Sequence, residues 1–110
     1  MKKVGIIRCQ QTEDMCPGTS DFKAASAGKG AFEEFGGAEI IGFVSCGGCP
    51  GKRAVPRARM LVDRGAEAIF LASCMRLGKP VGIPCPHIEA IREAVSKKID
   101  PVPVIDWTHN

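Results

Sequence analysis

The chain has 110 residues, of which 45% are hydrophobic and 25% are charged, and its net charge is +3 at neutral pH. This length and composition predict one soluble globular domain, residues 1–110, with a single modest core. No apolar run approaches the roughly 20 residues of a membrane span, and the weak, scattered charge with one Trp and no Tyr argues against nucleic acid as a partner.

The first predicted element is a strand over residues 4–8, which follows Met1-Lys2-Lys3 and ends at Cys9. Its apolar stretch is too short for a secretion signal, so we expect a cytoplasmic protein. Six cysteines in a reducing compartment are more often metal ligands or redox-active thiols than disulfide partners. The polar, irregular segment 10–18 comes next and contains Cys16.

Helices and strands then alternate along the chain. A helix is predicted from Thr19 or Ser20, either of which could cap it, to about residue 35. Further helices are predicted from about Gly51 to Arg64 and over residues 88–98. One face of the first helix is expected to carry Phe22, Ala25, Phe32 and Phe35, and the residues expected to face inward from the last helix are Ile88, Ile91 and Val95. The remaining strands are predicted at 39–45, 67–73 and 102–107, with a Gly/Pro-rich loop over 75–86.

The predicted strands are short and almost continuously apolar, which is typical of strands covered by helices on both faces. Right-handed crossovers between successive strands give a parallel sheet. The sequence therefore predicts an α/β fold of three layers, α/β/α, around a four-stranded, mainly parallel open sheet of the flavodoxin or Rossmann type.

The cysteines and histidines follow the ends of these strands. In a parallel sheet the carboxyl-terminal ends share one edge, where open α/β folds bind their ligands. Cys9, Cys46 and Cys74 are expected to end three strands, and His109 to follow the fourth. The loops beyond add Cys16, Cys49, Cys85 and His87. We expect this set to converge on one edge of the sheet.

The segment Cys46-Gly47-Gly48-Cys49 lies at the centre of the set. Gly47 and Gly48 allow a turn with positive φ and let the backbone approach a bound centre, so both are candidate cofactor-binding residues. The helix expected to begin near Gly51, together with Lys52 and Arg53, is expected to lower the pKa of nearby thiols.

The ordered cysteine and histidine positions resemble those of the CGGC domain family. The resemblance rests on Cys46-Gly47-Gly48-Cys49, on Cys9, on Cys16-Pro17-Gly18, on Cys74 and on Cys85-Pro86-His87. It covers nearly the whole chain and implies a metal-binding protein, for which zinc is usually suggested. The family offers no established reaction.

The main hypothesis is a metal–thiolate centre that binds zinc or an iron–sulfur cluster. Its candidate ligands are Cys9, Cys16, Cys46, Cys49, Cys74, Cys85 and His87, and the role of His109 is left open. Cys9 and Cys74 could instead be small buried core residues, and His87 could only cap a helix. Arg8 and Arg76 are expected to be solvated or charge-balancing.

Two other hypotheses belong to different classes. The pair Cys46 and Cys49 after a strand could be the site of a thiol–disulfide oxidoreductase that works with a redox partner. Alternatively, the glycine turns could hold phosphate or another small molecule, but neither GxxxxGK[ST] nor GxGxxG is present. The sequence names no substrate, and it leaves open whether the protein is an enzyme.

Overall fold

The structure is a computed structural model that describes residues 1–78 and 82–109. Four strands form one sheet in the order β2-β1-β3-β4, and each neighbouring pair is parallel. The strands are β1 (Lys2–Arg8), β2 (Ala38–Ser45), β3 (Ala68–Leu71) and β4 (Val104–Ile105). The predicted parallel sheet is confirmed, so the carboxyl-terminal ends of the strands share one edge.

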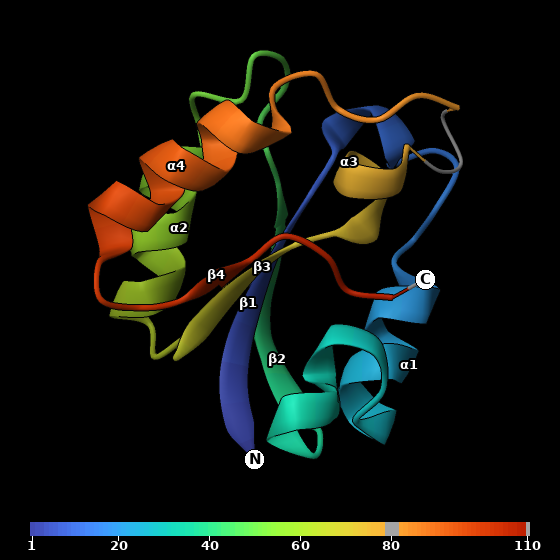
Figure 1. The fold of residues 1–110 in the computed structure, drawn as a ribbon, viewed down its shortest axis with the longest axis vertical. Helices are drawn as coiled ribbons and strands as arrows, with labels where there is room; N and C mark the ends of the chain where they lie inside the picture. Colours follow the sequence, from blue (N-terminus) through green and yellow to red (C-terminus); the bar gives the residue numbers. More distant parts are fainter. Residues whose placement is uncertain (79–81, 110) are drawn as a thin grey trace.

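Helices cover both faces of this sheet (Figure 1). On one face lie α2 (Ala54–Asp63) and α4 (Ile88–Ile99), and on the other lie α1 (Thr19–Ala27) and the 3₁₀ helix η2 (Gly30–Phe35). Two short helical segments, η1 (Gln10–Thr12) and α3 (Ser73–Leu77), follow β1 and β3. The predicted three-layer α/β/α architecture is confirmed. No helix in the described segments is long and apolar enough to cross a membrane.

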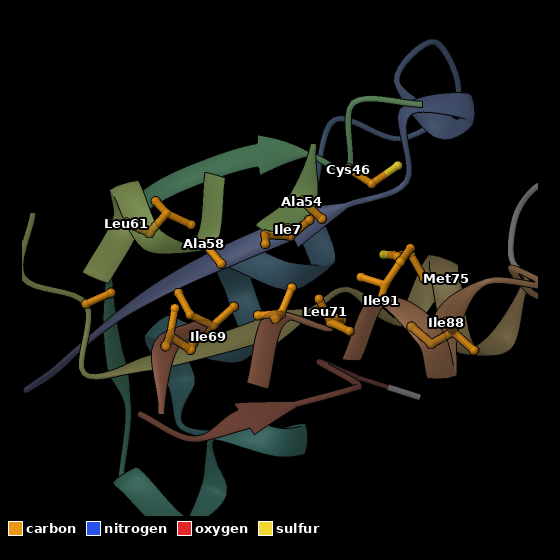
Figure 2. Close-up of a cluster of buried hydrophobic side chains, with 13 residues drawn as sticks. Ile7, Cys46, Ala54, Ala58, Leu61, Ile69, Leu71, Met75, Ile88 and Ile91 are labelled. Carbon is orange, nitrogen blue, oxygen red and sulfur yellow. The ribbon is translucent and has the colours of Figure 1, made fainter. Parts of the chain in front are cut away.

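The strands contribute to two cores because consecutive side chains of a strand point to opposite faces of the sheet. Ile7, Ile69 and Leu71 pack with the buried residues of α2 and α4, and Figure 2 shows this cluster. Ile6 and Phe70 pack on the other face, below α1 and η2. Burial on both faces explains why the central parts of β1 and β3 are apolar.

The predicted helix over residues 19–35 is divided into α1 and η2. Gly28 has φ +66 and ends α1 in the left-handed conformation. A single helix therefore does not extend to Phe35. Phe32 is fully buried, but Phe22 is 44% exposed and packs against Phe43, with ring centroids 5.1 Å apart. The prediction that Phe22 and Phe32 lie on one face of a single helix was therefore wrong.

Several predicted boundaries also differ from the structure. β3 ends at Leu71 rather than at Ser73, and Cys74 lies in the first turn of α3. β4 covers two residues instead of six, because Pro101 and Pro103 have no N–H groups to donate to a neighbouring strand. α3 also occupies the start of the predicted 75–86 loop, whose residues 79–81 lie outside the described part of the chain.

Candidate metal centre

Five of the six cysteines gather at the carboxyl-terminal edge of the sheet. A pocket of about 110 Å³ is lined by the thiols of Cys9, Cys49, Cys74 and Cys85, and Ile83 and Pro84 form part of its apolar wall. Cys46 is the fifth thiol, because it lies close enough to influence the ionisation of both Cys9 and Cys85. We refer to Cys9, Cys46, Cys49, Cys74 and Cys85 as the thiol cluster.

The topology of the sheet brings these residues together from four segments. Cys9 and Cys46 directly follow the parallel strands β1 and β2, and the Cys46 N–H donates to the Arg8 carbonyl oxygen at 2.7 Å. The Cys85 N–H donates to the carbonyl oxygen of Met75 in α3 at 2.7 Å, which holds the segment before α4 against the helix that carries Cys74. The predicted gathering is therefore present for these five thiols, although Cys74 lies in a helix rather than at a strand end.

The glycine turn separates Cys46 and Cys49 into different environments. Gly47 and Gly48 have φ values of +83 and +100, as the sequence predicts. A Cβ atom on Gly47 would lie 2.6 Å from the Arg53 side chain, so a larger residue would displace Arg53. Cys46 is 5% exposed and lies at one end of the buried cluster beside Ala54, as Figure 2 shows, whereas Cys49 is exposed. The cofactor-binding role of the two glycines stays a prediction.

Burial disfavours ionisation at two of the clustered thiols. Burial raises the pKa of Cys9, the Gln11 N–H opposes this rise by hydrogen bonding to the sulfur, and the nearby sulfurs of Cys46, Cys74 and Cys85 raise the pKa further. The pKa of Cys85 is raised in the same way. Burial is the largest cause, the His87 N–H opposes it by hydrogen bonding to the sulfur, and Cys46, Cys49 and Cys74 raise the pKa further. At Cys9 and Cys85 burial therefore outweighs the backbone donor, and the pKa of each thiol is raised.

The two backbone donors were not anticipated from the sequence. In each case the N–H belongs to the second residue after the cysteine, Gln11 after Cys9 and His87 after Cys85. We had expected the donors in the glycine turn. The only sequence signal was the position of each cysteine just before a short helical turn, where backbone N–H groups have no partner in the helix.

Three predicted or open candidates lie apart from the thiol cluster. Cys16 follows η1, its N–H donates to the Thr12 carbonyl oxygen at 2.8 Å, and in the described segments it does not line the pocket. His87 lines a separate cavity of about 310 Å³ with Lys52 and with residues of α2 and α4. His109 Nε2 lies 3.5 Å from Asp21 Oδ1. The ligand roles of Cys16 and His87 stay predictions.

The chemistry of the cluster fits a soft metal, because all five donors are sulfur atoms. In the described part of the chain, however, no three Cys, His, Asp or Glu side chains are arranged so that together they could hold a metal ion. The thiols therefore lie near one another without the geometry of a complete coordination shell. Some of their side chains would have to rotate before they could bind one metal ion together.

A parallel α/β domain with a cysteine-rich pocket at the carboxyl edge of its sheet defines the class of this protein. Residues 3–109 match the model of the CGGC domain family, and the chain belongs to that family. It is also similar to an uncharacterized protein of Methanocaldococcus jannaschii, with 38% identity over an alignment that covers 97% of this chain and 86% of that protein. No solved structure matches the chain significantly.

Proposed function

We propose that this protein binds a metal centre through the thiolates of the thiol cluster, and that the centre is an iron–sulfur cluster rather than a single zinc ion. The observation that carries the proposal is the gathering of five thiols at one pocket, which four of the cysteines line, while His87 lines a separate cavity and His109 Nε2 lies near Asp21. Donor sets of sulfur alone favour zinc, copper(I) and iron–sulfur clusters.

The crowding of the thiols supports a site for a cation. Closely spaced thiols oppose one another's ionisation, and three neighbouring sulfurs add to the larger effect of burial in raising the pKa of Cys9 and of Cys85. A metal centre supplies the positive charge that lets several thiols ionise together, and it releases their protons when it binds.

Two features favour a cluster over one zinc ion. The pocket of about 110 Å³ is several times larger than the roughly 30 Å³ that a water molecule occupies in the liquid, so it has room for more than one metal atom. Backbone N–H groups that donate to cysteine sulfur, as those of Gln11 and His87 do, also tune iron–sulfur centres.

The oxidoreductase hypothesis has less support. Helix α2 begins at Ala54, five residues beyond Cys49, so the positive end of the helix does not lie directly at the Cys46–Cys49 pair as that chemistry requires. All six cysteines are free, which fits the reducing cytoplasm that we propose as the location.

Anaerobic purification followed by metal analysis and an absorption spectrum tests the proposal. We expect brown protein that contains iron and sulfide. Colourless protein that contains zinc would agree with a thiolate metal site but would contradict the iron–sulfur centre. Cys9→Ser, Cys74→Ser and Cys85→Ser should each reduce the metal content at least severalfold, and circular dichroism would check that each variant is folded. The matched control is Cys16→Ser, which should keep its metal. Full metal content in a triple Cys9, Cys74 and Cys85 variant would refute the site.

A further inference from the structure

Arg8, the last residue of β1, places a cation in the protein interior beside the thiol cluster. Only 7% of this residue is exposed. Its guanidinium donates from Nη2 to Thr12 Oγ1 at 2.8 Å and from Nε to the Cys9 carbonyl oxygen at 3.4 Å. It also lies 5.7 Å from the centre of the Phe43 ring. All of these partners are electrically neutral.

Among the described residues, no carboxylate forms an ion pair with Arg8, whereas Arg59, Arg76 and Arg92 form ion pairs at the surface. A buried charge costs free energy that hydrogen bonds to neutral groups offset only in part. Of the two roles expected for Arg8, solvated or charge-balancing, burial contradicts the first. Its position indicates a negative charge nearby that the neutral thiols do not supply.

Thr12 connects Arg8 to the pocket. Its side chain is fully buried, and its Oγ1 lies 2.8 Å from the Cys9 carbonyl oxygen and 3.7 Å from Cys74 Sγ. The hydroxyl has one proton, so it can donate to only one of these acceptors at a time. An anionic sulfur is a stronger acceptor than a neutral carbonyl, so an anionic centre bound at Cys74 would draw this proton toward the pocket.

We propose that Arg8, acting through Thr12, is the fixed counter-charge for an anionic metal–thiolate centre in the thiol cluster. The inference rests on the proposed function and adds the sign of the centre's charge and the residue that balances it. Four thiolates outweigh the charge of one divalent ion, and four thiolate ligands likewise leave an iron–sulfur centre anionic. Arg8 is a positioning residue, because Thr12 lies between it and the cluster.

The alternative is that Arg8 only holds the loop after β1 through its hydrogen bonds to Thr12 and Cys9. The two roles predict different effects of Arg8→Lys on metal binding. Lysine keeps the charge, so with a counter-charge role Arg8→Lys should bind metal almost as well as the wild type. A purely structural arginine holds the loop through the geometry of its guanidinium, so Arg8→Lys should then bind as weakly as Arg8→Met.

The experiment compares wild type, Arg8→Met and Arg8→Lys, with Arg59→Gln as a control that loses the same charge from an exposed pair on α2. Zinc affinity is measured by competition with a chelator, and the stability of the metal-free protein by urea unfolding in reductant. We expect Arg8→Met to bind zinc roughly 10- to 100-fold more weakly, and the unfolding measurement checks that the metal-free variant is folded. Arg8→Lys and Arg59→Gln should bind within a few-fold of wild type.

A second pair of variants tests the role of the Thr12 hydroxyl separately from that of the Arg8 charge. Thr12→Val removes the hydroxyl and should weaken zinc binding, and Thr12→Ser should restore it. If the centre is an iron–sulfur cluster, Arg8→Met should also lower its reduction potential, because a nearby positive charge favours the added electron.

Each outcome has one meaning. Equal zinc affinity in wild type and Arg8→Met, or equally weak zinc binding by folded Arg8→Lys and Arg8→Met, would overturn the counter-charge alone. Failure of the wild-type protein to bind either zinc or a reconstituted cluster would overturn the proposed function, and the counter-charge with it.

Discussion

Cys9 and Cys85 show how burial and crowding govern a thiol at the scale of one residue. The pKa of each is raised, first by burial and then by neighbouring sulfurs. The unfolded chain exposes both thiols, so their pKa values there return to the ordinary value of about 8.5. In alkaline solution the unfolded chain therefore loses these protons before the folded protein does.

This difference predicts that alkali destabilises the metal-free protein. The contribution of the two thiols to the free energy of unfolding is complete below the ordinary thiol pKa and is lost as the pH rises through the raised values. Urea unfolding in reductant, measured between pH 7 and pH 10, should show this decline. A Cys9→Ser/Cys85→Ser double variant should show a smaller decline, because the serine hydroxyls do not titrate in this range.

The comparison with the double variant removes the contribution of the lysines, which both proteins share. Parallel stability curves for the two proteins would show that the two thiols have the same pKa in the folded and unfolded states, contrary to their burial.

At the scale of elements, hydrogen bonds from Thr108 in the C-terminal segment hold the start of helix α3 in place. The Ser73 N–H donates to Thr108 Oγ1 at 3.1 Å, and Ser73 Oγ accepts from the Thr108 N–H at 2.8 Å. Thr108 Oγ1 in turn donates to the buried carboxylate of Asp21 in α1 at 2.5 Å. A polar network thus joins both helices to the end of the chain, and it begins one residue before Cys74.

Removal of the Thr108 hydroxyl should therefore loosen α3. Thr108→Val keeps the shape of the side chain but leaves Asp21 and the Ser73 N–H without this partner, at a cost of about 1 to 3 kcal/mol in the free energy of unfolding. Urea unfolding of the metal-free protein measures the loss. Thr108→Ser keeps the hydroxyl and is the matched control, so a loss in Thr108→Val no larger than that in Thr108→Ser would contradict the role of the hydroxyl network.

At the scale of the whole molecule, the thiol cluster depends on parallel topology. Cys9, Cys46 and Cys74 are separated by long stretches of sequence, and they meet because β1, β2 and β3 run in the same direction and end at one edge. Cys85 joins them through its hydrogen bond to Met75. A metal bound by these thiols would therefore link segments that adjoin three strands and two helices.

Metal binding should then stabilise the whole fold rather than one loop. Zinc at about 100 times its dissociation constant should add about 2.7 kcal/mol to the free energy of unfolding, because only the folded chain presents the assembled site. Differential scanning calorimetry before and after chelation measures the shift in Tm. An unchanged Tm on loading would mean that the thiols bind zinc equally well in the unfolded chain.

The sequence by itself determined the order of the elements and the edge of the sheet that carries the cysteines. Continuous apolar strands alternating with amphipathic helices leave few arrangements other than a parallel three-layer fold, so the positions of Cys9 and Cys46 followed from where β1 and β2 end. Positive φ at Gly47 and Gly48 was likewise predictable, because the turn between the two cysteines is local.

Only the tertiary structure decided which of these residues meet, and in what charge environment. The exclusion of the His87 side chain from the pocket and the burial of Arg8 beside Thr12 depend on how helices and loops pack around the edge. Sequence spacing carries no information about these contacts, because they join segments whose relative positions are set by the two cores. The same packing raises the pKa of Cys9 and Cys85, because burial depends on every neighbour at once.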